Sequence, residues 1–261
     1  MKIKITENVL SVGVVAENMR CGVKINKILI AIGTCERFEY SEDACIKRIL
    51  EQTYKNFDLL IVDNSDGIEH EMDLKRRYPH VNIIHLERPQ IFRDATKQVR
   101  QFILDYTLEN KYEFMFLVDV DFIILPNTLE KLISHDKDFV TAAIGYMHQA
   151  YSTCLIPDYD SPHISNIPHL PVLKPIYWEE MKNPPFLQEI TACGLACALV
   201  KCKNLHGIKF EISHKKKAFM EDLLFCAELK KRGCKLFVDK TIETIHAHVQ
   251  MPERNWRKIT I

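Results

Sequence analysis

The side chains of this sequence that could do chemistry together are mainly acidic. Asp119 and Asp121 are separated by one residue and directly follow the apolar run 114–118. In an extended segment, residues i and i+2 face the same way, so both carboxylates would lie on one side and Val120 on the other. Two carboxylates at a strand end suit a hard divalent cation, which prefers oxygen ligands. Taken alone, the pattern is more often two solvated turn aspartates; its position after a strand in a βα series favours the cation site.

Two further polar clusters also follow apolar runs. Residues 33–34 follow the run 28–32, and residues 63–65 follow the run 57–62. In open parallel sheets, ligands bind at the carboxyl ends of the strands. If these runs are neighbouring parallel strands, their polar ends form one ligand site together with Asp119 and Asp121.

The pattern along the chain predicts the elements that would position these residues. We expect strands at 28–32, 57–62, 81–86, 114–118, 139–144, 190–200, 235–238 and 241–246, and helices at 41–53, 96–108, 126–134 and 221–231, with Gly233 after the last helix as its cap. Strands that alternate with helices indicate βαβ units. The predicted fold class is therefore α/β, with a mostly parallel central sheet flanked by helices.

We expect one domain over residues 1–261. Residues 1–26 carry no clear motif and are interpreted as an N-terminal extension. Residues 150–190 hold seven of the eleven prolines and are predicted to be a loop-rich insertion, because the regular pattern resumes after them.

Composition excludes several classes of protein. The 35 basic and 35 acidic residues balance, which argues against a nucleic-acid binder. No apolar stretch approaches the 18 residues of a membrane helix, and the N-terminus lacks the apolar core of a signal peptide, so a cytoplasmic location is expected. The nine cysteines form no C-x-x-C pair and are expected to be buried, reduced thiols.

With these motifs in order, the chain resembles the GT-A-fold glycosyltransferases of the large inverting family 2. Four segments carry the resemblance: 28–37, 46–65, 116–121 and 221–246. Gly233 and His246 follow Glu221 by 12 and 25 residues, a spacing that is similar to the family's C-terminal motif. The resemblance covers about residues 27–248, nearly the whole chain.

The resemblance implies a role for each motif on the donor side. It implies a nucleotide pocket lined by Ile32, Gly33, Thr34, Arg37, Asp63, Asn64, Asp119 and Val120. Asp63 would accept a hydrogen bond from the nucleotide base. Asp121 would hold a Mn²⁺ or Mg²⁺ ion directly, and Asp119 would lie nearer the ribose or a metal-bound water. His246 would supply a further metal or diphosphate contact, with His248 as the alternative.

On the acceptor side, the resemblance makes Asp222 the catalytic base and Glu221 the runner-up. Without the resemblance, Asp222 is simply an acidic residue favoured at a helix start by the helix dipole. The small residues of 193–197 would lie beside the acceptor or simply allow close packing of strands.

The sequence departs from the family pattern at two places. The first loop begins Gly33-Thr34 where the family has proline-threonine. Asp119, Val120 and Asp121 form the D-x-D motif of the family. The helix before this motif carries Arg93 and Lys97 where the family has an asparagine. These two side chains would contact the donor diphosphate or be solvated basic residues on a helix face.

The resemblance implies a metal-dependent inverting glycosyltransferase that uses a nucleotide-diphosphate sugar, with UDP and GDP both open as the nucleotide. Its acceptor would be a hydroxyl of a glycan, a lipid-linked sugar or a protein. The alternatives are a sugar-nucleotide nucleotidyltransferase, which would need a longer glycine-rich signature, and a catalytically silent nucleotide- or glycan-binding module. The basic stretch 214–217 is read as solvated or as a lid over the diphosphate, and the basic tail 254–258 suggests weak peripheral membrane contact.

Overall fold

The computed structural model describes residues 27–145, 150–163, 165–167, 169–212 and 221–247. The expectations for the N-terminal extension, the basic stretch 214–217, His248 and the basic tail lie outside the described residues. Within them, no helix is long and apolar enough to cross a membrane.

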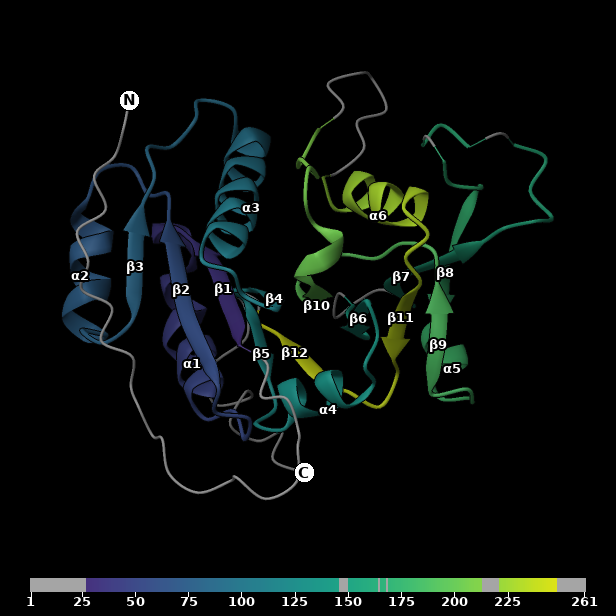
Figure 1. Cartoon of the computed structure of the whole chain (residues 1–261), viewed down its shortest axis with the longest axis horizontal. Helices are drawn as coiled ribbons and strands as arrows, with labels where there is room; N and C mark the ends of the chain where they lie inside the picture. Colours follow the sequence, from purple (N-terminus) through teal and green to yellow (C-terminus); the bar gives the residue numbers. More distant parts are fainter. Residues whose placement is uncertain (1–26, 146–149, 164, 168, 213–220, 248–261) are drawn as a thin grey trace.

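An eight-stranded sheet forms the centre of the molecule, in the order β3-β2-β1-β4-β10-β6-β11-β9 (Figure 1). Its strands are β1 (Ile28–Thr34), β2 (Phe57–Asp63), β3 (Asn82–His85), β4 (Phe114–Asp119), β6 (Phe139–Ala142), β9 (Leu187–Ile190), β10 (Cys197–Lys201) and β11 (Leu236–Asp239). The first four strands in this order are mutually parallel, and β6 is parallel to β11. Only the pairs made by β10 and β9 are antiparallel. The expected α/β fold with a mostly parallel sheet is therefore confirmed.

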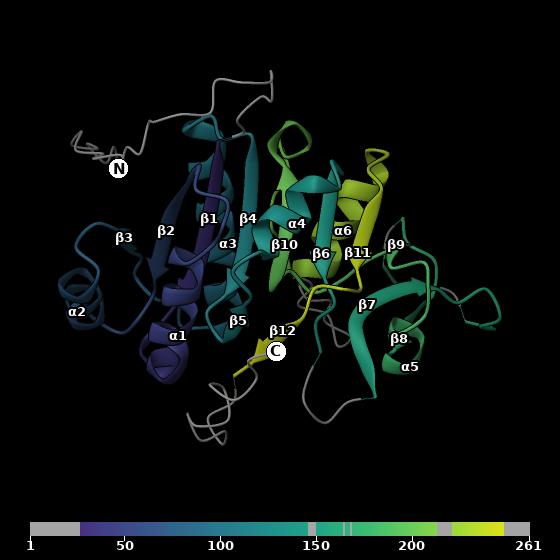
Figure 2. The ribbon, with the colours of Figure 1, turned by 90° about the horizontal axis from the view of Figure 1, so that it is seen from below.

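Helices cover both faces of this sheet (Figure 2). They are α1 (Glu39–Leu50), α2 (Glu69–Arg77), α3 (Phe92–Glu109), α4 (Thr128–Ser134), α5 (Trp178–Met181) and α6 (Glu221–Lys231). Ile28, Ile30 and Ile32 of β1 share one core cluster with residues of α1, α2 and α4. Leu29 and Ala31 face the other cluster, which contains residues of α3 and α6. Burial on both faces explains why β1 reads as a continuous apolar run.

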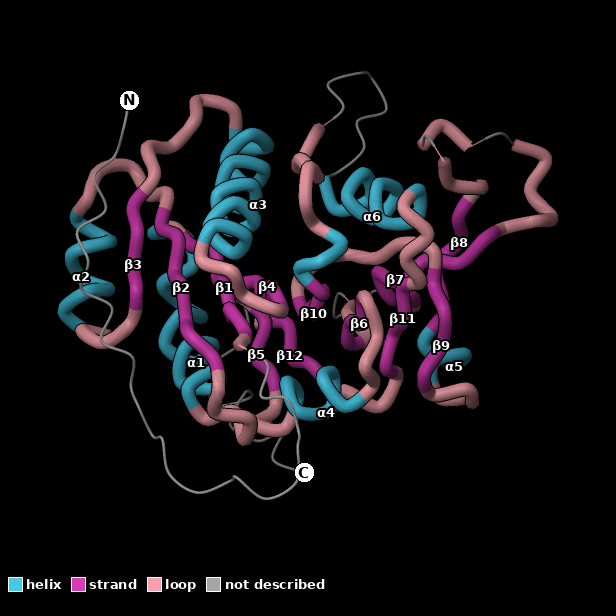
Figure 3. The backbone as a smooth tube through the Cα atoms, viewed as in Figure 1, coloured by secondary structure: helices cyan, strands magenta, loops and turns pink. Residues whose placement is uncertain are grey.

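Two small antiparallel sheets flank the central one. The pair β5 (Phe122–Ile124) and β12 (Thr244–His246) lies beyond the end of β4, and β7 (Tyr151–Pro157) pairs with β8 (Leu173–Tyr177). Figure 3 shows both pairs as strands among the loops. The loop-rich insertion predicted at 150–190 therefore also contains strands. Its prolines do not prevent them, because Pro157 is the last residue of β7 and Pro175 lies in the two-stranded sheet opposite Leu155.

Three other expectations differ from the structure. The strand predicted at 190–200 is interrupted, because β9 ends at Ile190 and β10 begins only at Cys197. The strand predicted at 241–246 is shorter, because β12 spans only Thr244–His246. Helix α2 was missed because most of its residues are charged. Gly233 does follow α6 with a φ of 79°, the left-handed conformation that favours glycine at a helix end.

All eight described cysteines are free and buried, as expected; Cys21 lies outside the described residues.

Candidate functional site

The three predicted polar clusters meet at the carboxyl edge of the parallel strands. Thr34, Asp63 and Asp119 are the last residues of β1, β2 and β4. In the register of the sheet, Thr34 lies opposite Asp63, and Gly33 lies opposite Asp119. The fold thus brings together the residues that the sequence places at three separate strand ends.

Asp121 and His246 form the next part of this edge. Nε2 of His246 lies 3.0 Å from Oδ2 of Asp121, and the side chains are only 8% and 20% exposed. The backbone reinforces the pair, because β12 pairs with β5 and Ala247 N donates to the carbonyl oxygen of Asp121. The His246 ring also stacks on Phe122, with ring centres 4.3 Å apart. His246, which the sequence spacing singled out, therefore lies against the D-x-D motif.

Arg100 joins the D-x-D motif to the acidic pair of α6, a role that was not predicted from the sequence. Its guanidinium lies 2.7 Å from Oε1 of Glu221 through Nη1 and 3.2 Å from Oδ1 of Asp119 through Nη2. Arg100 and Glu221 are both buried. An arginine on an amphipathic helix has no sequence feature that separates it from a solvated one, so only the docking of α3 reveals this contact.

Oδ2 of Asp222 and Oγ1 of Thr153 both lie close to Gly194. A methyl group placed on Gly194 would lie 3.8 Å from Oδ2 of Asp222 and 3.3 Å from Oγ1 of Thr153. That threonine oxygen is buried and makes no hydrogen bond within the described part of the chain. A carboxylate oxygen and a hydroxyl that both have hydrogen-bonding capacity to offer therefore lie beside the same glycine.

The surroundings of Asp222 favour its neutral form more strongly than the surroundings of a solvent-exposed aspartate do. Burial raises its pKa to about 6, the nearby Arg100 opposes this, and the adjacent Glu221 adds to it. The backbone N–H of Leu223 donates to Oδ1 of Asp222 at 2.7 Å, whereas Oδ2 lies on the side of Gly194. A carboxylate with this pKa is ionised at neutral pH and is a better proton acceptor than a solvated aspartate.

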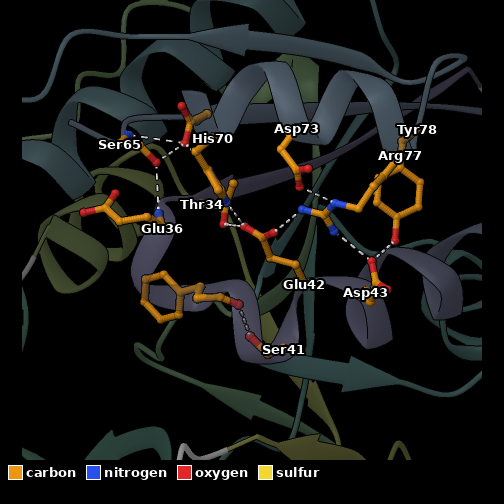
Figure 4. Close-up of polar contacts among 12 residues, drawn as sticks. Thr34, Glu36, Ser41, Glu42, Asp43, Ser65, His70, Asp73, Arg77 and Tyr78 are labelled. Atoms are coloured by element: carbon orange, nitrogen blue, oxygen red, sulfur yellow. Dashed lines mark hydrogen bonds and ion pairs between the residues drawn. The ribbon is translucent and has the colours of Figure 1, made fainter. Parts of the chain in front are cut away.

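Asp63 belongs to a buried polar network between β1, β2, α1 and α2, part of which Figure 4 shows. Nδ1 of His70 lies 2.8 Å from Oδ1 of Asp63, and Nε2 lies 2.9 Å from Oε1 of Glu42. Thr34 and Arg77 bind the same Glu42 carboxylate, at 2.6 and 3.0 Å. Burial alone would lower the pKa of His70, but the two carboxylates outweigh it and raise that pKa to about 10. His70 is therefore a buried imidazolium between two carboxylates.

The first loop is held by an ion pair across the edge of the sheet. Arg88 binds Glu36 through two parallel contacts of 2.8 and 2.6 Å and donates through Nε to the carbonyl of Asn64. The hydrogen bond with Arg88 lowers the pKa of Glu36 to about 2. Lys97 pairs with Asp94 of its own helix at 3.1 Å. The side chain of Arg93 lies outside the described part of the chain.

The residues fit a divalent cation whose coordination is completed by the phosphates of a substrate. Among the described residues, no group of three or more His, Cys, Asp or Glu side chains is arranged to hold a metal ion. Asp121 and His246 do offer one oxygen and one nitrogen ligand at the same point. Mg²⁺ is commonly bound by one or two carboxylates together with substrate phosphates, so a complete protein cage is not required.

The mostly parallel α/β sheet with its flanking helices is a fold of the GT-A type, and sequence comparison gives the family. The sequence model of glycosyl transferase family 2 matches residues 43–206. This is more than half of the 261 residues, so the chain belongs to this family and is a glycosyltransferase. A search among curated proteins finds no match.

Solved structures support the fold. The structure of S. aureus TarS 1-349 in complex with UDP-GlcNAc is 14% identical, with a TM-score of 0.54, over 87% of this chain and 60% of that chain. S. aureus TarS is also 14% identical, with a TM-score of 0.53, over 85% of this chain and 37% of that chain. This chain therefore spans less than two thirds of either TarS chain. A197 from STIV is 16% identical over 85% of this chain and 86% of that chain, with a TM-score of 0.46.

Proposed function

We propose that the protein is a metal-dependent, inverting glycosyltransferase that moves a sugar from a nucleotide-diphosphate sugar to a hydroxyl group. The observation that carries the proposal is the contact of Arg100 with both Asp119 and Glu221. Through it, the D-x-D motif and the acidic pair of α6 share one edge of the sheet. A donor held at the first and an acceptor held at the second would be close enough to react.

On the donor side, we assign the diphosphate to Asp121 and His246 with a bound Mn²⁺ or Mg²⁺. Such an ion would offset the negative charge that grows on the diphosphate as the glycosidic bond breaks. Thr34 with the rest of the first loop, and Asn64 after β2, would enclose the nucleoside. We favour UDP as the nucleotide, because one structural neighbour was solved with UDP-GlcNAc.

On the acceptor side, we assign the general base to Asp222 rather than to Glu221. Oδ2 of Asp222 lies beside Gly194, whereas the carboxylate of Glu221 is buried and paired with Arg100. The base would take the proton of the acceptor hydroxyl while its oxygen attacks the anomeric carbon. Direct displacement inverts the configuration at that carbon. The acceptor would be a glycan, a lipid-linked sugar or a protein, and we expect the enzyme to work in the cytoplasm.

The first experiment measures thermal stabilisation by UDP, GDP, CMP and dTDP, each with Mn²⁺ and with EDTA. A ligand that binds only the folded state raises stability by about 2.7 kcal/mol at a hundred times its dissociation constant. We expect one diphosphate nucleotide to stabilise the protein, and EDTA or Asp121→Ala to remove the effect. A transfer assay with the corresponding sugar nucleotide then tests turnover. Binding without any transfer would support the silent module, and release of inorganic pyrophosphate would support the nucleotidyltransferase.

A further inference from the structure

Two exposed tyrosines stand side by side at one end of the two-stranded sheet formed by β7 and β8. Tyr151 begins β7 and Tyr177 ends β8, and their Cα atoms are partners in the register. The ring centres are 6.3 Å apart, and the ring planes meet at 83°. The two residues are 39% and 49% exposed, so each keeps ring surface open to solvent. The pair therefore offers an aromatic surface that also carries two hydroxyl groups.

The backbone around Tyr151 holds this surface at the carboxyl edge of the central sheet. Strand β10 is antiparallel to both β4 and β6, so β4 and β6 run parallel and end at the same edge. The backbone N–H of Thr153 donates to the carbonyl oxygen of Ile144, two residues after β6, at 2.8 Å. The hydroxyl of Ser152 is buried and donates to the carbonyl oxygen of Ile176 in β8 at 3.1 Å. The tyrosine pair is therefore fixed on the edge that also carries the D-x-D motif.

Thr153 connects the tyrosine pair with the proposed base, Asp222. Burial alternates at the start of β7, where the first and third residues are more exposed than the second and fourth, so Tyr151 and Thr153 share one face of the strand. On that face, Oγ1 of Thr153 lies beside Gly194, as does Oδ2 of Asp222. Two residues of a strand span about 7 Å. Tyr151 therefore lies about one sugar ring further along β7 than the threonine beside the base.

The charges near the pair do not suit an anionic acceptor. Helix α5 follows Tyr177 directly and has two glutamates in its first turn. Lys182, which follows α5, lies 3.6 Å from Glu179, and Lys174 of β8 lies 3.5 Å from Asp158. The basic side chains of β8 and of the end of α5 are thus both paired with carboxylates, and the remaining glutamate leaves this region negative. A surface of this charge favours an uncharged ligand over a phosphorylated one.

We propose that Tyr151 and Tyr177 bind a sugar ring of the acceptor, one unit away from the sugar whose hydroxyl reacts at Asp222. One face of many hexose rings carries mainly C–H groups, which pack against the negative face of an aromatic ring, while the hydroxyls at the ring edge can bind the phenol groups. This assignment rests on the proposed function, because it requires an acceptor at Asp222. It makes the acceptor an uncharged glycan of at least two sugar units, rather than a protein or a single lipid-linked sugar.

The test begins with a printed array of single sugars, neutral oligosaccharides and anionic oligosaccharides, to which the labelled protein is applied with UDP and Mn²⁺. The oligosaccharide that binds most strongly is then titrated by calorimetry into the unmodified protein and into Tyr151→Ala, Tyr151→Phe and Tyr177→Ala. Tyr159→Ala is the matched control, because Tyr159 is 86% exposed but lies beyond the other end of β7. The melting temperature and the UDP affinity of each variant report whether it is folded and whether its donor side is intact.

We expect the array to show binding to neutral oligosaccharides and not to single sugars. Tyr151→Ala and Tyr177→Ala should each weaken oligosaccharide binding roughly tenfold, as expected for the loss of one aromatic contact. Tyr151→Phe keeps the ring, so it should bind nearly as well as the unmodified protein, and Tyr159→Ala should bind equally well. UDP affinity should be the same in all of them.

Oligosaccharide affinity that is unchanged in folded Tyr151→Ala and Tyr177→Ala variants would overturn the inference while leaving the proposed function intact. The same conclusion follows if the array binds only anionic glycans, only single sugars or nothing, although UDP and Mn²⁺ stabilise the protein. If no nucleotide stabilises the protein, the proposed function fails, and the inference fails with it.

Discussion

Glu221 and Asp222 are neighbours in the sequence, yet their surroundings give them different chemical roles. Glu221 is buried against Arg100, and its charge is used to hold that guanidinium. Asp222 has a raised pKa and an oxygen beside Gly194. We therefore expect Asp222→Asn to lower the rate of sugar transfer by about 10²- to 10⁴-fold, the usual contribution of a general base. Calorimetry should show donor affinity near that of the unmodified protein; transfer at the normal rate would refute the assignment.

The pKa of Asp222 also predicts the pH dependence of the reaction. The base acts only when ionised, so activity should be low below its pKa of about 6 and should rise to a plateau above it. The measurement is kcat/KM for transfer between pH 4.5 and 8.5, with circular dichroism at each pH to confirm that the protein stays folded. A profile without a step between pH 5 and 7 would count against Asp222 as the base.

At this scale, the sequence predicts residues that belong to short motifs and misses those defined by tertiary contact. Asp119, Asp121 and His246 were found by spacing, and the structure brings them to one place. Arg100 was not found, because a basic residue on a helix has many ordinary roles. Thr153 was missed for another reason: its hydroxyl borders the site only because β7 packs beside the segment that carries Gly194.

At the scale of elements, β1 and α3 pack so closely that Gly33 has no room for a side chain. A methyl group at Gly33 would lie 2.6 Å from Cγ1 of Val99. Gly33→Ala should therefore destabilise the protein by about 1–3 kcal/mol through overpacking. Val99→Ala removes the clashing group. Gly33→Ala should therefore cost less stability in the Val99→Ala variant than in the unmodified protein. Urea unfolding of the two single variants and the double variant measures the coupling, and strict additivity would contradict the predicted clash.

His70 joins helix α2 to β2 and α1, so the free energy of unfolding of the protein should depend on pH. The folded-state pKa of His70 is raised from 6.5 to about 10. A raised pKa means that the stabilisation is fully present below pH 6.5 and is lost as the pH rises toward 10. The free energy of unfolding of the unmodified protein should exceed that of His70→Gln at pH 6.5, and the difference should shrink by pH 10. A pH-independent difference would show that His70 is neutral.

The elements themselves were predicted as far as apolar periodicity reveals them. Strands such as β1, β2 and β4 are continuous apolar runs because helices cover both faces of the sheet. The same rule fails for α2, whose charged residues form ion pairs with α1, such as Arg77 with Asp43 at 2.8 Å. It fails for β7 and β8 because their prolines resemble a loop in the sequence.

At the scale of the whole molecule, Arg100 connects the parallel half of the sheet with α6. Arg100→Leu would leave the buried Glu221 carboxylate without its partner and should cost roughly 3–5 kcal/mol of stability. Arg100→Lys keeps the charge but cannot reach Glu221 and Asp119 with a planar fork, so its loss should be smaller. Guanidinium unfolding of the two variants measures both effects. Equal stability of Arg100→Leu and the unmodified protein would mean that the bridge contributes nothing.

The buried cysteines can report how often the elements around them unfold locally. Burial raises the pKa of Cys154, Cys197 and Cys202 to about 12, so almost none of the reactive thiolate exists at neutral pH. An alkylating reagent should modify these positions only while the surrounding element is open. With Cys21 replaced by serine, mass spectrometry of the labelled peptides would time the exposure of β7, of β10 and of the segment after β10 separately, without any added probe.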